Sequence, residues 1–194
     1  HPERERLPGI ETTSGPLGSG LSQAIGMALA ARLDRKTHHT YALLSDGEQE
    51  EGNTWEAIMF AGKQKLSNLT AVLDRNNIQI DGYTEDVMPL EPLRAKYEAF
   101  NWHVIEADGH SFTSIISAVA EAKVIHERPT MIIMHTVPGR GVSWMENDYR
   151  WHGMPPNLKE VSGAPAQHEQ ARAALKELRE RGAKIREDYR NDSF

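Results

Sequence analysis

Asp46 and Asn76 are the residues whose types and spacing first indicate chemistry in this sequence. Asp46 stands in SDGEQEEG, directly after an apolar run, and Asn76 stands in LDRNNIQIDG, thirty residues later. A carboxylate and a carboxamide are hard oxygen ligands, and Mg²⁺ binds few protein ligands of this kind beside phosphate oxygens. Gly47 allows close approach of the main chain, and the amino end of a following helix would offer N–H groups to an anion. The pair therefore indicates a metal-diphosphate site, although spacing alone leaves open that both are ordinary turn residues.

The elements around these residues alternate between short apolar runs and longer runs with helical spacing of apolar residues. Such alternation predicts βαβ units, which is an α/β fold with a parallel sheet and helices on both faces. The stretch RNNIQIDG is predicted to be a loop. The predicted strands are 40–45, 69–74, 102–107 and 130–137, and the predicted helices are 21–35, 53–65, 91–100 and 111–125.

Ligands bind at the carboxyl ends of the strands in sheets of this kind. The loops that follow Ser45, Asp74 and Val137 are therefore predicted to form the site. Asp46 and Asn76 are then expected to be neighbours about 5 Å apart, because adjacent strands have that spacing.

The composition of the chain changes near Ala164. Residues 1–163 are predicted to be one globular domain, and the charged residues 164–194 a helical tail or connector. This helix either packs on the domain or docks on another chain. Its apolar residues form a narrow stripe, which consists of Ala171, Leu175, Leu178, Ile185 and Tyr189.

The overall composition excludes several classes of function. Of the 194 residues, 39% are hydrophobic and 26% are charged, which is typical of a globular protein. No apolar run approaches the roughly 20 residues of a membrane span. The net charge of −6 argues against nucleic-acid binding, which needs a basic surface. The absence of cysteine excludes disulfides, thiolate metal sites and cysteine nucleophiles, and a cytoplasmic location is expected.

Several motifs, in the same order, resemble the transketolase family. The Asp-Gly followed about thirty residues later by Asn resembles the thiamine-diphosphate motif. LPGIETTSGPLGSGLSQAIGMALA is similar to the family segment GVETTGPLGQG, and GRGVSWMENDYRWHG is similar to a later segment that ends in His-Gly. The resemblance runs from His1 to about Asn157 and is closest to the amino-terminal subunit of split transketolases, so it implies the thiamine-diphosphate-binding fold.

This resemblance implies a role for each matching residue in cofactor binding. Asp46 and Asn76 would ligate a divalent metal, Mg²⁺ or Ca²⁺, with the main-chain carbonyl of Ile78 as a third protein ligand. The Gly47 amide would hold the diphosphate of thiamine diphosphate, and Asn76 would also belong to the cofactor site. The ring site of the cofactor would be lined by Gly15, Leu17 and Ile80.

The resemblance also implies roles in catalysis. Glu51 would touch the catalytic glutamate of a partner chain across the interface between the two chains. His1 and His152 would contact the hydroxyl and carbonyl groups of the substrate, with His152 also near the diphosphate. The implied reaction is the transfer of a two-carbon ketol unit from a ketose phosphate to an aldose phosphate, as in the pentose phosphate pathway.

Activity would depend on a partner, because split transketolases carry the pyrimidine-binding domain and the cofactor-activating glutamate on a separate carboxy-terminal half. The expected assembly is a homodimer or a heterotetramer. One departure stands out: transketolases carry two further histidines upstream of the matching segment, and this sequence starts after both.

Three alternatives stay open. Half of another thiamine-diphosphate enzyme, of the deoxyxylulose-phosphate synthase or 2-oxo acid dehydrogenase type, fits the metal motif but fits TTSGPLGSG and WHG less well. A non-catalytic transketolase-like protein, either a scaffold or a regulatory subunit, is consistent with the missing histidines, and it need not bind thiamine diphosphate. The third alternative is a generic nucleotide binder. This sequence lacks the Gly-x-Gly-x-x-Gly turn that such a protein would carry after its first strand.

Overall fold

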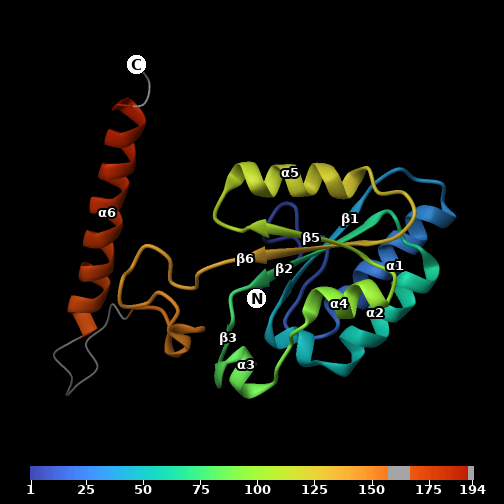
Figure 1. The fold of residues 1–194 in the computed structure, drawn as a ribbon, viewed down its shortest axis with the longest axis horizontal. Helices are drawn as coiled ribbons and strands as arrows, with labels where there is room; N and C mark the ends of the chain where they lie inside the picture. Colours follow the sequence, from blue (N-terminus) through green and yellow to red (C-terminus); the bar gives the residue numbers. More distant parts are fainter. Residues whose placement is uncertain (157–166, 192–194) are drawn as a thin grey trace. The chain divides into compact units, whose positions relative to one another are not determined.

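The computed structural model describes residues 1–156 and 167–191 and divides into two compact units. The first unit comprises residues 1–77 and 83–136, and the second comprises residues 78–82 together with the described part of 137–194. Figure 1 shows the sheet, which belongs to the first unit, and the long helix α6, which belongs to the second. The predicted domain boundary between residues 163 and 164 lies outside the described residues.

Four parallel strands form the sheet of the first unit in the order β1-β2-β6-β5 (Figure 1). The prediction of a parallel sheet is confirmed. Ser45 lies opposite Asp74, and Arg75 lies opposite His135, so the carboxyl ends of three neighbouring strands share one edge. The strands are β1 Thr40–Ser45, β2 Leu69–Arg75, β5 His103–Asp108 and β6 Thr130–His135.

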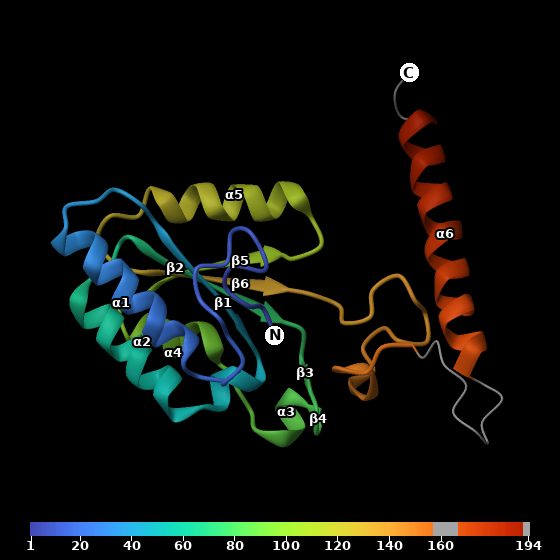
Figure 2. The same cartoon turned by 180° about the vertical axis from the view of Figure 1, so that it is seen from behind.

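Helices cover both faces of this sheet, as predicted. Figure 2 shows α1, α2 and α4 on one face and α5 on the other. The first face and its helices share one buried apolar cluster, and α5 closes a smaller cluster over β5 and β6. The helices are α1 Gly20–Leu33, α2 Gly52–Gln64, α4 Leu93–Ala99 and α5 Phe112–Lys123.

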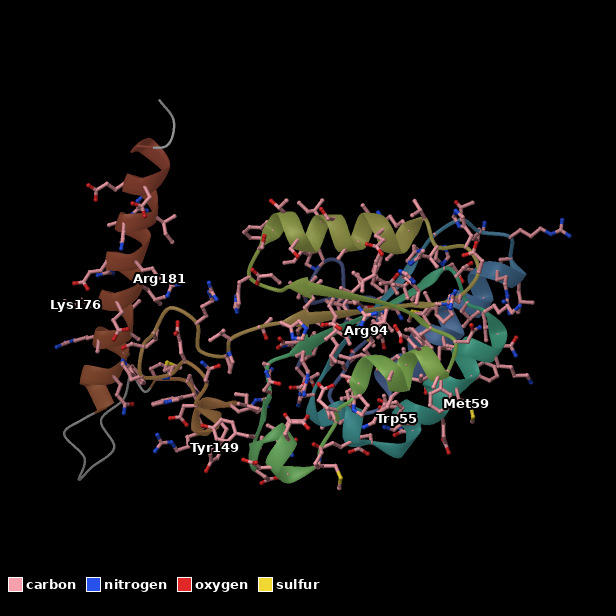
Figure 3. All side chains as sticks on the ribbon, in the orientation of Figure 1. Trp55, Met59, Arg94, Tyr149, Lys176 and Arg181 are labelled. Atoms are coloured by element: carbon pink, nitrogen blue, oxygen red, sulfur yellow. The ribbon has the colours of Figure 1, made fainter. Side chains whose placement is uncertain are left out.

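An aromatic group on the first face ties α2 and α4 together. The Trp102 indole Nε1 donates to the Ile58 carbonyl oxygen at 2.9 Å, and the Tyr97 hydroxyl donates to Gln49 Oε1 at 2.6 Å. Burial raises the pKa of the Tyr97 hydroxyl, which therefore stays protonated and able to donate. Trp55 packs beside Tyr97 with the ring centroids 5.8 Å apart, next to α4 (Figure 3). These contacts anchor the segment that follows β1, because Gln49 lies in it.

The stretch predicted as a loop after β2 contains regular structure. β3 (Ile78–Gln79) and β4 (Gly82–Tyr83) pair as a separate two-stranded sheet, and the single-turn helix α3 (Thr84–Val87) follows. Strands of two residues are too short to show the alternation from which a strand is predicted. The last predicted strand also ends earlier, at His135.

In the second unit, the helix α6 (Gln167–Asn191) agrees with the predicted C-terminal helix. Ser143 binds it through the main-chain N–H and the hydroxyl, which donate to the two carboxylate oxygens of Glu177 at 2.7 and 3.2 Å. Arg181, labelled in Figure 3, lies 3.5 Å from a Glu146 carboxylate oxygen. The segment after β6 therefore packs along α6 through polar contacts.

The apolar stripe predicted on α6 is only partly buried. Ala171 is buried, whereas Leu175, Leu178 and Ile185 are 48%, 46% and 59% exposed. The side chain of Tyr189 lies outside the described residues. No helix within residues 1–156 and 167–191 has the length and apolar content that crossing a membrane requires.

Two helical glycines offer a test of this packing. A Cβ at Gly62 in α2 would overlap the carbonyl oxygen of Phe100, whereas a Cβ at Gly26 in α1 would meet nothing within 4 Å. Helix propensity alone favours alanine by about 1 kcal/mol at both positions. We expect Gly62→Ala to lower the free energy of unfolding by about 1–3 kcal/mol through overpacking. The control Gly26→Ala should raise it by about 0.5–1 kcal/mol. Urea denaturation measures both, and equal effects would contradict the packing described for α2.

Candidate functional site

The carboxyl edge of the sheet brings the two predicted metal ligands to neighbouring positions. Asp46 directly follows β1, and Asn76 directly follows β2. These strands pair in parallel, with Ser45 opposite Asp74, so the two residues extend from adjacent strand ends as predicted. The two predicted oxygen ligands therefore follow two strands that are fixed to each other by main-chain hydrogen bonds.

Asp46 is completely buried, and its two carboxylate oxygens have different environments. Oδ2 accepts from the Asn77 main-chain N–H at 2.6 Å, from Arg75 Nη1 at 3.0 Å and from the Thr84 hydroxyl at 3.4 Å. Oδ1 is buried and accepts no hydrogen bond from the described part of the chain. Burial raises the pKa of the Asp46 carboxyl, and the Arg75 guanidinium opposes that shift. A buried carboxylate oxygen without a donor is costly, and a cation would compensate for it.

Arg75 contacts this carboxylate as well, although none of the sequence motifs predicted a role for it. Its side chain is only 3% exposed, and Nη2 donates to Glu85 Oε1 at 2.7 Å and to Glu91 Oε1 at 3.0 Å. One guanidinium and three carboxylates, including Asp46, have a formal sum of −2. This local excess of negative charge favours a divalent cation. A charged residue at the end of an apolar strand was the signal that could have identified Arg75.

Asp74 holds the Asn76 side chain by a hydrogen bond. The Asn76 Nδ2 donates to Asp74 Oδ2 at 3.0 Å, and the Thr136 hydroxyl donates to Asp74 Oδ1. The Thr136 main-chain N–H also donates to the Arg75 carbonyl oxygen at 3.2 Å, which joins the start of the segment after β6 to the end of β2. Because its nitrogen is engaged by Asp74, the Asn76 carboxamide presents its oxygen away from that carboxylate.

These residues fit a hard divalent cation bound by few protein ligands. Asp46 Oδ1 would supply a charged oxygen, and the Asn76 carboxamide would supply a neutral one. Among the described residues no cluster of three or more His, Asp or Glu side chains could hold a metal. Ile78 is buried but belongs to the second unit, so its carbonyl as a third ligand stays a prediction.

The glycine-rich segment before α1 packs directly on the segment that follows β1. The Gly18 main-chain N–H donates to Glu48 Oε1 at 2.9 Å. A Cβ at Gly18 would lie 2.5 Å from Asn53 Oδ1 and 2.8 Å from the Glu51 Cβ, and its φ of +79° also favours glycine. Burial raises the pKa of the Glu48 carboxyl. This contact brings the segment of Gly15 and Leu17 to that of Gly47 and Glu51, which the resemblance places in one site.

Two further predicted residues of the first unit lie together. A Cβ built on Gly15 would lie 3.4 Å from the His1 ring, so these residues are in contact. Leu17 is 54% exposed, as expected of an apolar residue that contacts a cofactor or a partner. Gly47 begins η1 (Gly47–Glu50), and this short 3₁₀ turn separates it from α2, whereas the amino end of a helix was predicted directly after Gly47.

The remaining predicted residues belong to the second unit. Ile80 is 75% exposed and lies between β3 and β4. His152 is partly buried and follows η2 (Tyr149–Trp151), and its main-chain N–H donates to the Tyr149 carbonyl oxygen at 2.8 Å. Trp151 also makes an edge contact with Trp144, with the ring centroids 4.8 Å apart. The positions of Ile80 and His152 in a common site with Asp46 stay predictions.

Comparisons with known proteins identify the family. The family described as transketolase, thiamine diphosphate binding domain, matches residues 1–171. The chain belongs to the transketolase family. That match spans every predicted site residue from His1 to His152, and it agrees with the resemblance seen in the sequence motifs.

Curated transketolase subunits are similar to this chain over nearly its whole length. The 6-deoxy-6-sulfo-D-fructose transketolase subunit SqwG of Clostridium sp. is 44% identical over 94% of this chain and 63% of its own length. An apulose-4-phosphate transketolase subunit of Phocaeicola vulgatus is 42% identical over 97% of this chain and 63% of its own length. The chain thus spans just under two thirds of these relatives.

A solved transketolase also has this fold. The transketolase from Leishmania mexicana superposes with a TM-score of 0.75 and 34% identity over 92% of this chain, which corresponds to 27% of its own chain. The fold described above is therefore that of the transketolase family.

Asn77 offers a test of how the site is held. It has a φ of 64° and is exposed, and its main-chain N–H bonds to Asp46 Oδ2. We expect Asn77→Ala to cost about 1–2 kcal/mol of unfolding free energy, because alanine is strained in the left-handed region. The control Asn77→Gly should stay within about 0.5 kcal/mol of the unmodified chain, because glycine adopts this conformation freely. Chemical denaturation compares the three proteins, and an alanine variant as stable as the glycine variant would refute this account.

Proposed function

We propose that this chain is the diphosphate-binding half of a transketolase, a transferase that moves a two-carbon ketol unit between sugar phosphates. The observation that carries the proposal is the buried Asp46 carboxylate, whose Oδ1 has no hydrogen-bond donor among the described residues and lies at the strand end next to that of Asn76. The match to a thiamine diphosphate binding domain supports the same conclusion. Activity requires a partner chain that supplies the pyrimidine-binding half.

The proposed metal site comprises Asp46 Oδ1, the Asn76 carboxamide oxygen and the Ile78 carbonyl around Mg²⁺ or Ca²⁺. Thiamine diphosphate, when bound, supplies the nucleophilic carbon that accepts the ketol unit. The Gly47 amide binds its diphosphate together with the metal. The cofactor ring contacts Gly15, Leu17 and Ile80, and the exposed apolar side chains of the last two support this role.

The residues that face the substrate act by hydrogen bonding and proton transfer. His152 and His1 bind the hydroxyl and carbonyl oxygens of the sugar, and an imidazole can give or take a proton near neutral pH. Glu51 is exposed at the start of α2, and its proposed role is to orient the catalytic glutamate of the partner chain. The cofactor would not be activated without this second chain, because the second chain carries the activating glutamate.

The substrate class follows from the names of the relatives. One name gives a sulfonated ketose and the other gives a phosphorylated ketose. A ketose that carries an anionic group is common to both, and we propose the same class for this chain, with an aldose phosphate as acceptor. Both relatives are named as subunits, which supports the need for a partner.

Cofactor binding provides the first test of this proposal. We expect calorimetry to detect Mg²⁺-dependent binding of thiamine diphosphate that appears or tightens when a carboxy-terminal transketolase half is added. Asp46→Ala should weaken binding at least about 100-fold, because it removes the only charged ligand proposed for the metal. Asp34→Ala is the matched control, because Asp34 is an exposed aspartate at the far end of α1, and it should bind as the unmodified chain does.

The opposite result would point to a scaffold. If the folded chain bound no thiamine diphosphate with or without the partner, Asp46 would be a buried turn residue and not a ligand. Equal binding by Asp46→Ala and the unmodified chain would also refute the proposed metal site.

His152 provides a separate test of catalysis. In the assembled enzyme, we expect His152→Ala to lower kcat by about 10²-fold or more, because a positioned proton-transfer group contributes about 10²–10⁴-fold. The control is His126→Ala, because His126 is exposed and precedes β6 at the opposite edge of the sheet. Steady-state kinetics should show little change in the control, and an active His152→Ala enzyme would exclude His152 from the chemistry.

A further inference from the structure

We propose that Arg75 is a positioning residue, which orients the Asp46 carboxylate so that Oδ1 faces the divalent metal. Glu85 and Glu91 hold the guanidinium in place. The inference rests on the proposed function, since it concerns the metal that Asp46 would bind. It adds three residues to the site, none of which the sequence motifs or the family match assigns.

The two ends of the Arg75 guanidinium have different partners. Nη1 donates to Asp46 Oδ2 at 3.0 Å, whereas Nη2 donates to Glu85 at 2.7 Å and to Glu91 at 3.0 Å. The planar guanidinium has a rigid arrangement of donors, so fixing Nη2 also fixes the direction of Nη1. Glu85 and Glu91 are themselves held, because they accept from the main-chain N–H groups of Leu90 at 3.1 Å and Leu93 at 2.8 Å.

This arrangement determines how Asp46 can bind a metal. All three of its hydrogen-bond donors, from Arg75, Asn77 and Thr84, bind the same oxygen, Oδ2. The other oxygen is buried without a donor from the described residues. The carboxylate therefore contacts the protein with one oxygen and keeps the other for a cation, which corresponds to a monodentate ligand. Partners that orient a ligand in this way typically contribute about 10–100-fold to metal affinity.

A purely structural role explains the arrangement less well. Native structures pair nearly all buried polar atoms, and a network that served stability alone would not leave Oδ1 without a partner. Buried ion pairs are also often no more stabilising than apolar residues of the same volume. Arg94, labelled in Figure 3, shows the contrasting case: it pairs with Glu98 and Glu106 at the surface, where its side chain is 44% exposed.

The test compares Arg75→Met with the matched control Arg94→Met in the whole chain. Mg²⁺ is titrated in saturating thiamine diphosphate, with the partner half present if the unmodified chain requires it. Free Mn²⁺, followed by electron paramagnetic resonance, serves as a second probe that does not depend on turnover. We expect Arg75→Met to weaken metal binding by about 10–100-fold. Arg94→Met should change it less than about twofold, because surface ion pairs contribute little.

Two more variants separate positioning from stability. Arg75→Lys keeps the charge but loses the planar pair of donors, so it should recover most of the unfolding free energy lost in Arg75→Met while metal affinity stays at least about fivefold weaker. Glu85→Gln keeps Arg75 and weakens its anchor, and a several-fold loss of metal affinity is expected. This variant tests the inference even if Arg75→Met does not fold.

The outcomes that overturn the inference differ from those that overturn the proposed function. Metal affinity that is unchanged in folded Arg75→Met, or in Glu85→Gln where Arg75→Met does not fold, would refute the positioning role alone. If Arg75→Lys recovered both the unfolding free energy and the metal affinity in full, only the positive charge of Arg75 would matter, and the positioning role would be refuted. An unmodified chain that binds no metal with thiamine diphosphate and partner present would overturn the proposed function and this inference together.

Discussion

The burial of the Asp46 carboxylate is the constraint on which the rest of the site depends. A carboxylate with no exposed surface is unfavourable unless donors surround it, and here all of them reach a single oxygen. Arg75 and Asn77 can supply those donors only because β2 lies beside β1 in the sheet. Asp46 therefore depends on three features: the order of the strands, the charge of Arg75 and the left-handed turn at Asn77.

The same edge of the sheet explains why the glycine-rich segment before α1 belongs to the site. Glu48 follows Asp46 by two residues and accepts from the main chain of Gly18, and the absence of a side chain at Gly18 permits contact with Glu51. Tyr97 holds the segment after β1 from the opposite side by its bond to Gln49. The segment between β1 and α2 is thus held by main-chain and side-chain bonds, which would preorganise the proposed diphosphate site.

Periodicity predicted those parts of the structure that are long enough to show it. All four strands of the main sheet and the helices between them were predicted, and the strand rule placed Asp46 beside Asn76 because that relation depends only on topology. Arg75 stands out in the sequence as a charged residue at the end of an apolar strand, but its pairing with Glu91 was not predictable, because neither strand nor helix periodicity relates residues sixteen positions apart. Two-residue strands likewise carry no pattern. The family resemblance implied roles for the residues that match its motifs, but it implied none for Arg75.

The metal end and the substrate end of the proposed site differ in how they are supported. Asp46, Asn76 and Gly47 are placed by the sheet of the first unit and by hydrogen bonds within it. His152 and Ile80 belong to the second unit, and Ile80 has most of its apolar surface exposed. In the proposed function, the cofactor ring would cover this exposed side chain of Ile80. The proposed metal ligands Asp46 and Asn76 are therefore placed by this chain's own sheet, whereas the proposed sugar transfer would also need the cofactor and the partner chain.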